Sequence, residues 1–417
     1  MRFSPFSGAP SAVACFLAAI AGQGLAQPES KLEPSAPADR GRLSSFLEAR
    51  AIVERRRETI DAEISASGPY SAALVDELNA LALLYREIGE DDLAAQSLEH
   101  ALQIVRANSG LFSLDQVPLI EQLIAAERAR GNGAAVAELE RQLLALAYRH
   151  PTDLRSAGIL RRAADRQIEL FGLYVDRALP PQVTVNIGFA DMGARRPLPP
   201  DVVFMRRAQR YYFDAIDVLH RTGSFDYEAL KELETKLLYT YHLERTHGER
   251  DLGRLEAIAR VGRQTYERLI AYATIGDVPL EERARALVGL ADWQLLFSKN
   301  STALELYREV YAMLADAGGH DALLAELFAP ETPIALPTFA SDHFVAPTTS
   351  DARYVELTFD ISKYGKGRGM RVTDSKGESA EDAAREMIRK IARSRFRPML
   401  VDGEPVRASS VVVRYGF

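Results

Sequence analysis

Cysteine is almost missing from this chain. The only one among its 417 residues is Cys15, which lies in an apolar stretch near the N-terminus. If the chain is cleaved after Ala26, the mature form has no cysteine, which excludes disulfide bonds, thiol nucleophiles and cysteine–metal sites. Long hydrophobic runs are also scarce: residues 11–21 are too few to cross about 30 Å of hydrocarbon as a helix. We therefore expect no transmembrane segment in the mature chain.

Motifs for catalysis, metal binding and phosphate binding are missing as well. The sequence contains no GxSxG, HExxH or Walker pattern, and Gly365, Gly367 and Gly369 do not form GxGxxG. The seven histidines are scattered. His242 and His247 stand five positions apart, so they would not share a helix face as paired metal ligands do. We expect no catalytic residue, no cofactor and no metal.

The overall charge is mildly acidic. Lys and Arg number 51 against 58 Asp and Glu, which gives a formal net charge of −7. No general basic field is present to attract nucleic acid, so we expect no nucleic-acid partner. From Lys363 onward the balance reverses to 13 Lys and Arg against 7 Asp and Glu. This reversal would steer the C-terminal end toward an anionic partner, although an ordinary mixed surface explains it equally well.

The N-terminus has the features of a secretory signal over residues 1–26. Arg2 precedes the apolar stretch, and Gly24 and Ala26 put small residues at the −3 and −1 positions of a cleavage site. Cys15 lies inside the stretch rather than after it, which argues against a lipoprotein. We therefore expect export to the periplasm, followed by a flexible, proline-containing lead-in over residues 27–42.

The body of the chain, residues 43–329, has apolar residues at spacings of three and four, typical of amphipathic helices. Its helical segments are similar in length, which suggests that they form antiparallel pairs. The clearest pair has packing residues Leu78, Leu81, Ala82, Tyr85, Gly89, Ala94, Leu98 and Ala101. The alanines permit close approach of two helices, and Gly89 can end the first one in a left-handed conformation. This pattern resembles the tetratricopeptide repeat (TPR), although the proline that often follows the second helix is missing.

Two weaker copies extend the resemblance, with packing residues Ile120, Leu123, Ile124, Gly131, Val136 and Leu143 in one and Leu287, Leu290, Ala291, Ala303, Tyr307 and Val310 in the other. The resemblance implies a mainly α solenoid of stacked hairpins with a groove for a peptide or protein. In the clearest copy, the residues expected to line that groove are Asp76, Asn79, Leu83 and Arg86. Prolines bracket a short β-like run at 183–187, so residues 176–203 form an irregular insertion.

The C-terminal region has a different pattern. Prolines punctuate residues 330–350, which predicts an extended linker. In residues 351–417 the apolar period changes to two, and only residues 379–395 form an amphipathic helix. The predicted order is two strands, a helix and then one or two strands. This order indicates a small α+β domain.

Three motifs in this domain resemble the C-terminal domain of TonB-type energy transducers. They are Ser394-Arg395-Phe396-Arg397-Pro398, Asp402-Gly403-Glu404-Pro405-Val406 and the final Val-Val-Arg-Tyr-Gly-Phe. The resemblance covers about 65 of the 417 residues and implies a periplasmic domain that contacts envelope partners. Arg395 and Arg397 are the side chains we expect at that contact. The chain has a cleavable signal and a short linker where the family has a membrane helix and a long spacer, which argues against energy transduction.

These patterns predict a non-catalytic binding or scaffold protein of the cell envelope, in which the solenoid holds one partner and the C-terminal domain another. Two alternatives remain open. One is an envelope enzyme with its site in the solenoid groove or in residues 176–203, which a buried carboxylate or histidine with a shifted pKa would favour. The other is a structural protein whose C-terminal domain binds peptidoglycan, which retention on purified sacculi would reveal.

Overall fold

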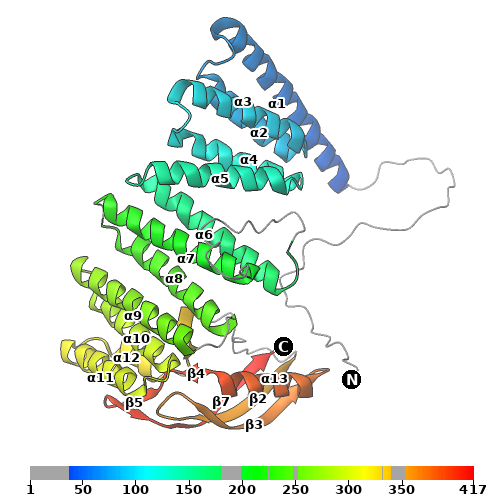
Figure 1. The fold of residues 1–417 in the computed structure, drawn as a ribbon. Helices are drawn as coiled ribbons and strands as arrows, with labels where there is room; N and C mark the ends of the chain where they lie inside the picture. The colour runs from blue at the N-terminus through cyan, green and yellow to red at the C-terminus, as the bar shows by residue number, and fades with distance from the viewer. Residues whose placement is uncertain (1–36, 180–198, 224, 248–251, 331, 340–352) are drawn as a thin grey trace, which may run out of the picture. The chain divides into compact units, whose positions relative to one another are not determined.

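A computed structural model describes residues 37–179, 199–223, 225–247, 252–330, 332–339 and 353–417 (Figure 1). The chain divides into two compact units, residues 1–55 and residues 56–417. The predicted signal segment and the β-like run at 183–187 lie outside the described residues. Among the helices that are described, none combines the length and the apolar character needed to cross a membrane.

Twelve α-helices precede the C-terminal strands in the described part of the chain: α1 Pro37–Ser67, α2 Leu74–Glu87, α3 Asp91–Ser109, α4 Val117–Ala129, α5 Gly133–Arg149, α6 Leu154–Val175, α7 Pro200–Arg221, α8 Tyr227–His247, α9 Leu252–Ile275, α10 Leu280–Leu296, α11 Asn300–Ala317 and α12 Asp321–Phe328. A short 3-10 helix, Leu114–Gln116, precedes α4. From α2 to α11 the α-helices pack as successive pairs, and each pair contacts the next (Figure 1). The predicted solenoid of helical hairpins is therefore confirmed. Helix α1 begins at Pro37, so the end of the predicted lead-in is helical.

The hairpin of α2 and α3 confirms the clearest predicted repeat. Ala82 and Ala94 are completely buried, and Gly89 between the helices has a φ of +78°. Glycine adopts this left-handed conformation without the steric cost that a Cβ would bring. The packing side chains predicted in all three copies are buried as well. The repeat pattern therefore identified helix–helix contacts correctly.

The predicted insertion at 176–203 connects the two helices of one hairpin. Helix α6 ends at Val175, and α7 begins at Pro200, so the last residues of the insertion are the first turn of α7. Residues 180–198, which hold most of it, are outside the described part of the chain. The two helices still pack closely along their length.

The C-terminal elements are β1 Ala335–Leu336, β2 Tyr354–Ile361, β3 Gly367–Lys376, α13 Ala380–Arg393, β4 Arg395–Phe396, β5 Met399–Val401, β6 Glu404–Val406 and β7 Ala408–Gly416. The strands β3, β2 and β7 form an antiparallel sheet in that order. Helix α13 packs Met387 and Ile391 into a core with Leu357, Phe359 and Tyr415 from the sheet. The predicted order of two strands and a helix is thus observed. More strands follow the helix than we predicted, because β4, β5 and β6 are too short to show an alternating pattern.

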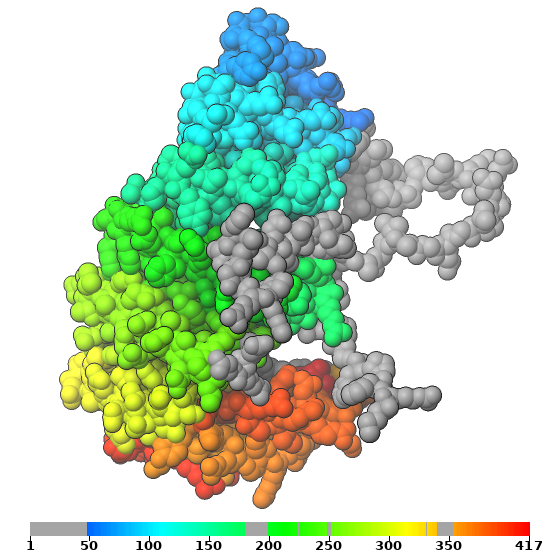
Figure 2. Space-filling model, in the orientation of Figure 1, coloured from blue at the N-terminus to red at the C-terminus, as the bar shows by residue number. Residues whose placement is uncertain are grey.

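These C-terminal strands pack against the last helices of the solenoid, as the orange and red surface beside the yellow helices shows in Figure 2. Strand β1, which lies in the predicted linker 330–350, pairs with β4 through Ala335 opposite Phe396. Next to this pairing, the backbone N–H of Arg397 donates to the carbonyl oxygen of Ile334 over 2.9 Å. Residues 334–336 of the predicted linker therefore form backbone hydrogen bonds with the C-terminal domain.

A buried ion pair between Arg397 and Asp292 of α10 is the central contact of this junction. The guanidinium donates from Nη2 to Oδ2 over 2.6 Å and from Nε to Oδ1 over 3.0 Å, and the two side chains are only 7% and 4% exposed. The hydroxyl of Tyr307 donates to the same carboxylate over 2.7 Å. Burial raises the pKa of Tyr307 well above its ordinary value, so this hydroxyl keeps its proton. Three hydrogen bonds thus offset the desolvation of the Asp292 carboxylate.

Helices α9 and α10 approach each other closely at two glycines. A Cβ added to Gly262 would overlap the indole ring of Trp293, and one added to Gly289 would overlap the ring of Tyr266. Both glycines lie in helix interiors, where glycine is intrinsically unfavourable. The aromatic rings therefore fill the space that these missing side chains leave.

We expect Arg397→Met to lower the free energy of unfolding by about 3–5 kcal/mol, because it leaves a buried carboxylate without a cation. Arg308→Gln is the matched control: Arg308 also bridges the junction, to Glu404, but this pair is exposed and its loss should change little. The double variant Asp292→Asn with Arg397→Met should recover part of the loss. Urea denaturation checks all three, and equal effects of the two arginine variants would contradict the assignment.

We expect Gly262→Ala to destabilise the chain by about 1–3 kcal/mol, since the added methyl group meets the Trp293 ring in a packed core. The matched control is Gly172→Ala in α6, where no atom lies within 4 Å of the added Cβ. That change should stabilise by up to about 1 kcal/mol through helix propensity alone. Thermal and urea unfolding give the sign of each effect. Stabilisation by both substitutions would show that α9 and α10 are not in close contact.

Candidate functional site

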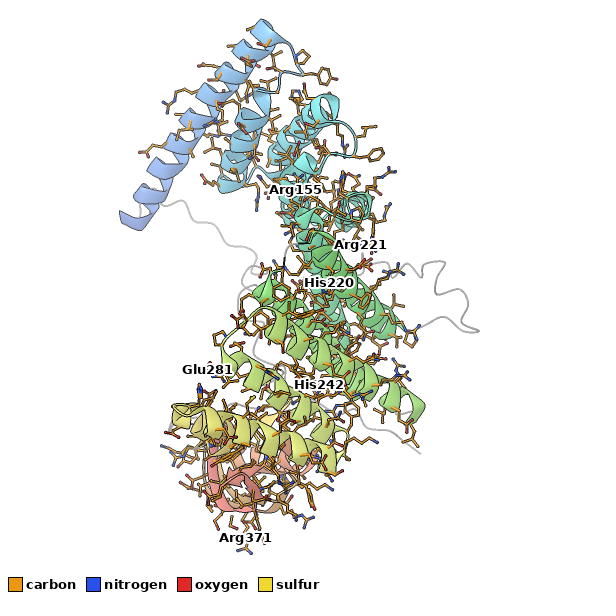
Figure 3. The ribbon with its side chains drawn as sticks, turned by 90° about the vertical axis from the view of Figure 1, so that its left-hand side faces the viewer. Arg155, His220, Arg221, His242, Glu281 and Arg371 are labelled. Carbon is orange, nitrogen blue, oxygen red and sulfur yellow. The ribbon has the colours of Figure 1, made fainter. Side chains whose placement is uncertain are left out.

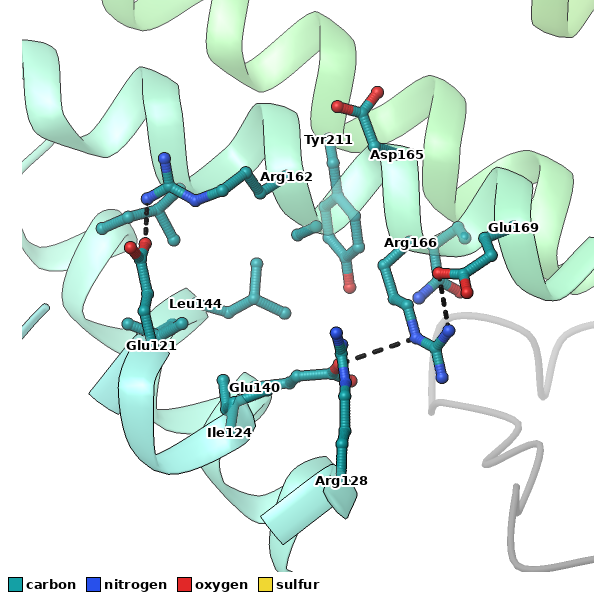
Figure 4. A pocket seen from close by; sticks show the side chains of 14 residues that line it. Glu121, Ile124, Arg128, Glu140, Leu144, Arg162, Asp165, Arg166, Glu169 and Tyr211 are labelled. Carbon is teal, nitrogen blue, oxygen red and sulfur yellow. Dashed lines mark hydrogen bonds and ion pairs between the residues drawn. The ribbon is translucent and has the colours of Figure 1, made fainter. Parts of the chain in front are cut away.

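A surface groove of about 410 Å³ lies between the hairpins α4–α5 and α6–α7 (Figure 4), and we call it the hairpin groove. Helices α4, α5, α6 and α7 all contribute to its wall. Its apolar lining consists of Ile124, Leu143, Leu144, Ile159 and Ala163. A space of this size accommodates several apolar side chains of a ligand.

Charged side chains surround this apolar lining, and oppositely charged neighbours pair with each other (Figure 4). Arg162 of α6 pairs with Glu121 of α4. Arg128 Nη2 lies 2.9 Å from Glu140 Oε1. Arg166 Nη1 lies 2.6 Å from Glu169 Oε2, and its Nε lies 3.7 Å from Glu140 Oε1. These pairs are partly exposed, so they add little stability, but they hold the long side chains away from the apolar lining.

The fourth acidic residue of the groove, Asp165, is bound by side chains of α7 and α8. Its Oδ1 accepts hydrogen bonds from the Tyr212 hydroxyl over 2.6 Å and from Lys236 Nζ over 2.7 Å. Each of the four carboxylates that line the groove therefore has a cationic neighbour. Gln167 differs, because its buried Oε1 accepts no hydrogen bond from the described residues.

The repeat register relates the groove to the residues predicted in the clearest copy. Gly89 and Gly131 lie 42 positions apart. Asn79 and Arg86 therefore correspond to Glu121 and Arg128, two of the charged residues of the hairpin groove. Two of the four positions selected from the sequence, Asn79 and Arg86, thus have counterparts in the groove one repeat later. Carrying the register forward to the second copy would have identified them.

The predicted groove residues themselves lie on α2. Asp76, Leu83 and Arg86 are exposed, with Leu83 at 45%, while Asn79 is half-buried. The Oδ1 atom of Asn79 is buried and has no hydrogen-bond partner among the described residues. Their spacing places them along one face of the helix, as predicted. They do not line the hairpin groove, so their role in binding stays a prediction.

The two arginines predicted at a partner contact are used within the chain. Arg397 is buried in its ion pair with Asp292, so it is not on an accessible surface and we remove it from the candidate contact. The reason is that the segment between β4 and β5, which carries Arg397, packs against the solenoid instead of facing solvent. Arg395 is half-buried and donates from Nη2 to Ser298 Oγ over 3.2 Å and from Nη1 to the Tyr364 carbonyl over 3.3 Å.

Side chains able to bind metal do not gather in groups of three or more anywhere in the described residues. His242 (labelled in Figure 3) is 4% exposed, and its ring lies 6.2 Å from that of Phe339. His247 instead makes an edge-to-face contact with Phe171 at 5.5 Å. The two histidines therefore pack against different aromatic rings.

Comparison with known proteins gives only distant similarities. No protein-family model matches the chain, and no curated protein matches it. Among solved structures, a Podosopora anserina putative kinesin light chain with nearly identical TPR-like repeats is 15% identical, covering 60% of this chain and 99% of its own, with a TM-score of 0.33. BtubC (BKLC) from P. vanneervenii is 15% identical, covering 68% and 94%, with a TM-score of 0.34. At these values the similarity assigns neither family nor partner, and the repeat architecture rests on the hairpins described above.

Proposed function

We propose that this chain is a non-catalytic binding scaffold that holds a partner polypeptide in the hairpin groove. The observation that carries the proposal is an apolar lining of five side chains, of which Leu144 and Ala163 are half-buried and the rest buried, between charged residues that pair with one another. An apolar anchor of a partner would displace water from this lining, which is the dominant favourable term in association.

Binding accounts for the groove better than catalysis does. An acid–base catalyst needs a carboxyl group or histidine free to exchange a proton with substrate. In the groove, Glu121, Glu140, Asp165 and Glu169 are each held by a lysine or arginine. Such pairing fixes the position of each carboxylate relative to its cationic partner. This arrangement supports the proposal that the groove binds a partner rather than catalyses a reaction.

We further propose that the scaffold is exported and acts in the periplasm. The support is the N-terminal sequence, with a short apolar stretch and small residues before Gln27, and the lack of cysteine beyond Cys15. The similarity of the last 65 or so residues to TonB-type C-terminal domains agrees with this location. In this proposal the C-terminal domain contacts a second envelope partner, while also closing the end of the solenoid.

The groove proposal is tested with a displayed peptide library and the immobilised mature chain. We expect selected peptides to contain an apolar anchor, and Leu144→Glu to weaken their binding at least tenfold, because it puts a carboxylate into the apolar lining. The matched control is Leu93→Glu, at a leucine of α3 that is 38% exposed and outside the groove. Equal binding by the two variants, with both folded by circular dichroism, would overturn the groove assignment.

The export proposal predicts a mature chain that begins at Gln27 and is recovered from the periplasm of a Gram-negative host. Mass spectrometry of the purified protein gives its N-terminus directly. Ala26→Asp should leave the precursor uncleaved, since the −1 position needs a small residue, whereas Gln27→Ala should be processed normally. If the wild-type chain is recovered unprocessed from the cytoplasm, the export proposal is wrong.

A further inference from the structure

Two half-buried arginines lie beside the turn that joins α10 and α11. Arg245, near the end of α8, has its guanidinium carbon 5.9 Å from the centre of the Phe297 ring. Arg395 of β4 donates to the hydroxyl of Ser298, the next residue of the turn, over 3.2 Å. Segments far apart in the sequence thus bring two positive charges to one short turn.

Neither guanidinium has a carboxylate partner among the described residues. Arg245 reaches only the ring nitrogen Nδ1 of His242, over 3.5 Å, and its Nε is buried without any hydrogen-bond acceptor. Arg395 donates to two neutral oxygens, the Ser298 hydroxyl and the Tyr364 carbonyl. Arginine has five N–H donors, so both side chains keep hydrogen-bonding capacity for a further acceptor.

Three other half-buried arginines of the chain pair with a carboxylate, whereas Arg106 donates to the amide oxygens of Gln116 and Gln142. Arg268 donates to Glu234 over 2.6 Å, Arg254 to Glu244 over 2.8 Å and Arg414 to Glu356 over 3.1 Å. In each of these pairs, a carboxylate offsets the cost of removing the guanidinium from water. At Arg245 and Arg395 burial lowers the pKa of the guanidinium, and no carboxylate of the described residues counteracts this shift. An anion from outside would supply the compensation.

Ser298 adds a hydroxyl that suits the same ligand. It is exposed, and its backbone φ of +61° is a left-handed conformation that serine adopts at a cost. Its Oγ accepts a hydrogen bond from Arg395, so its own proton remains available to donate. The turn therefore presents a hydroxyl donor next to the guanidinium of Arg395.

We propose that the α10–α11 turn is a binding site for an oxyanion, a carboxylate or phosphoryl group of a ligand, held by Arg395 and Ser298 and neutralised by Arg245. The site is separate from the hairpin groove and does not depend on the proposed function. It lies where the last hairpin meets the C-terminal strands, so a bound anion would contact both.

The probes are inorganic phosphate and succinate, each titrated against sodium chloride of equal ionic strength with the mature chain. We expect a saturable rise of the unfolding temperature with at least one of them, because a ligand that binds only the folded state stabilises it. A response to phosphate alone identifies a phosphoryl ligand, and a response to succinate alone a carboxylate ligand. If neither anion exceeds chloride, the proposal is wrong.

Variants locate the effect. Arg245→Gln and Arg395→Gln should each weaken binding of the responding anion about tenfold or more, the change expected for loss of one charge-assisted contact. Arg283→Gln, at an exposed arginine of α10, is the matched control and should bind as the wild type does. The comparison uses the anion dependence of each protein, so a change in basal stability does not affect it. An unchanged anion response in both Arg245→Gln and Arg395→Gln would place the binding elsewhere.

Discussion

The ion pair of Arg397 with Asp292 determines how the two kinds of structure in this chain fit together. A solenoid built from hairpins leaves the apolar face of its last hairpin without a following repeat, and such an end needs a cover. Here the cover is the C-terminal domain, and the Asp292 carboxylate of α10 receives its cationic partner, Arg397, from the segment between β4 and β5. Packing alone would tolerate several orientations, whereas a buried pair with two directed hydrogen bonds tolerates very few.

Local patterns in the sequence were sufficient for the solenoid helices and the longer strands. The three- and four-residue spacing of apolar side chains predicted the hairpins, and Ala82, Gly89 and Ala94 predicted how one of them closes. Alternation predicted β2 and β7. The junction was beyond such reasoning, because Arg397 and Asp292 are 105 positions apart and nothing in their immediate neighbours indicates the pairing. The same holds for the pairing of β1 with β4, two residues each, which is too short to give a periodic signal.

The hairpin groove shows a second limit of sequence reasoning. The predicted groove residues on α2 belong to the copy that matches the repeat pattern best. A good match to that pattern shows how well the two helices of one hairpin pack against each other, not whether they line a groove. A groove needs side chains from four helices of two hairpins, and its rim depends on which charges meet across them, such as Arg162 of α6 with Glu121 of α4. The repeat register predicts which positions are equivalent between hairpins, but only the fold shows which of these residues line a groove.

The register of the C-terminal sheet has a mechanical consequence. Gly416, near the end of the chain, pairs with Tyr354, the first residue of β2, so the terminus and the chain entering the sheet lie at the same end. Tension between the C-terminus and the solenoid would therefore load the hydrogen bonds of β7 one after another, starting from this pair. Strand β7 would therefore separate from β2 at low force. A higher force would be needed if all its hydrogen bonds were sheared at the same time. The contacts of Arg397 lie before β7 in the chain, so the domain could lose its last strand to a pulling partner while remaining joined to the last hairpin.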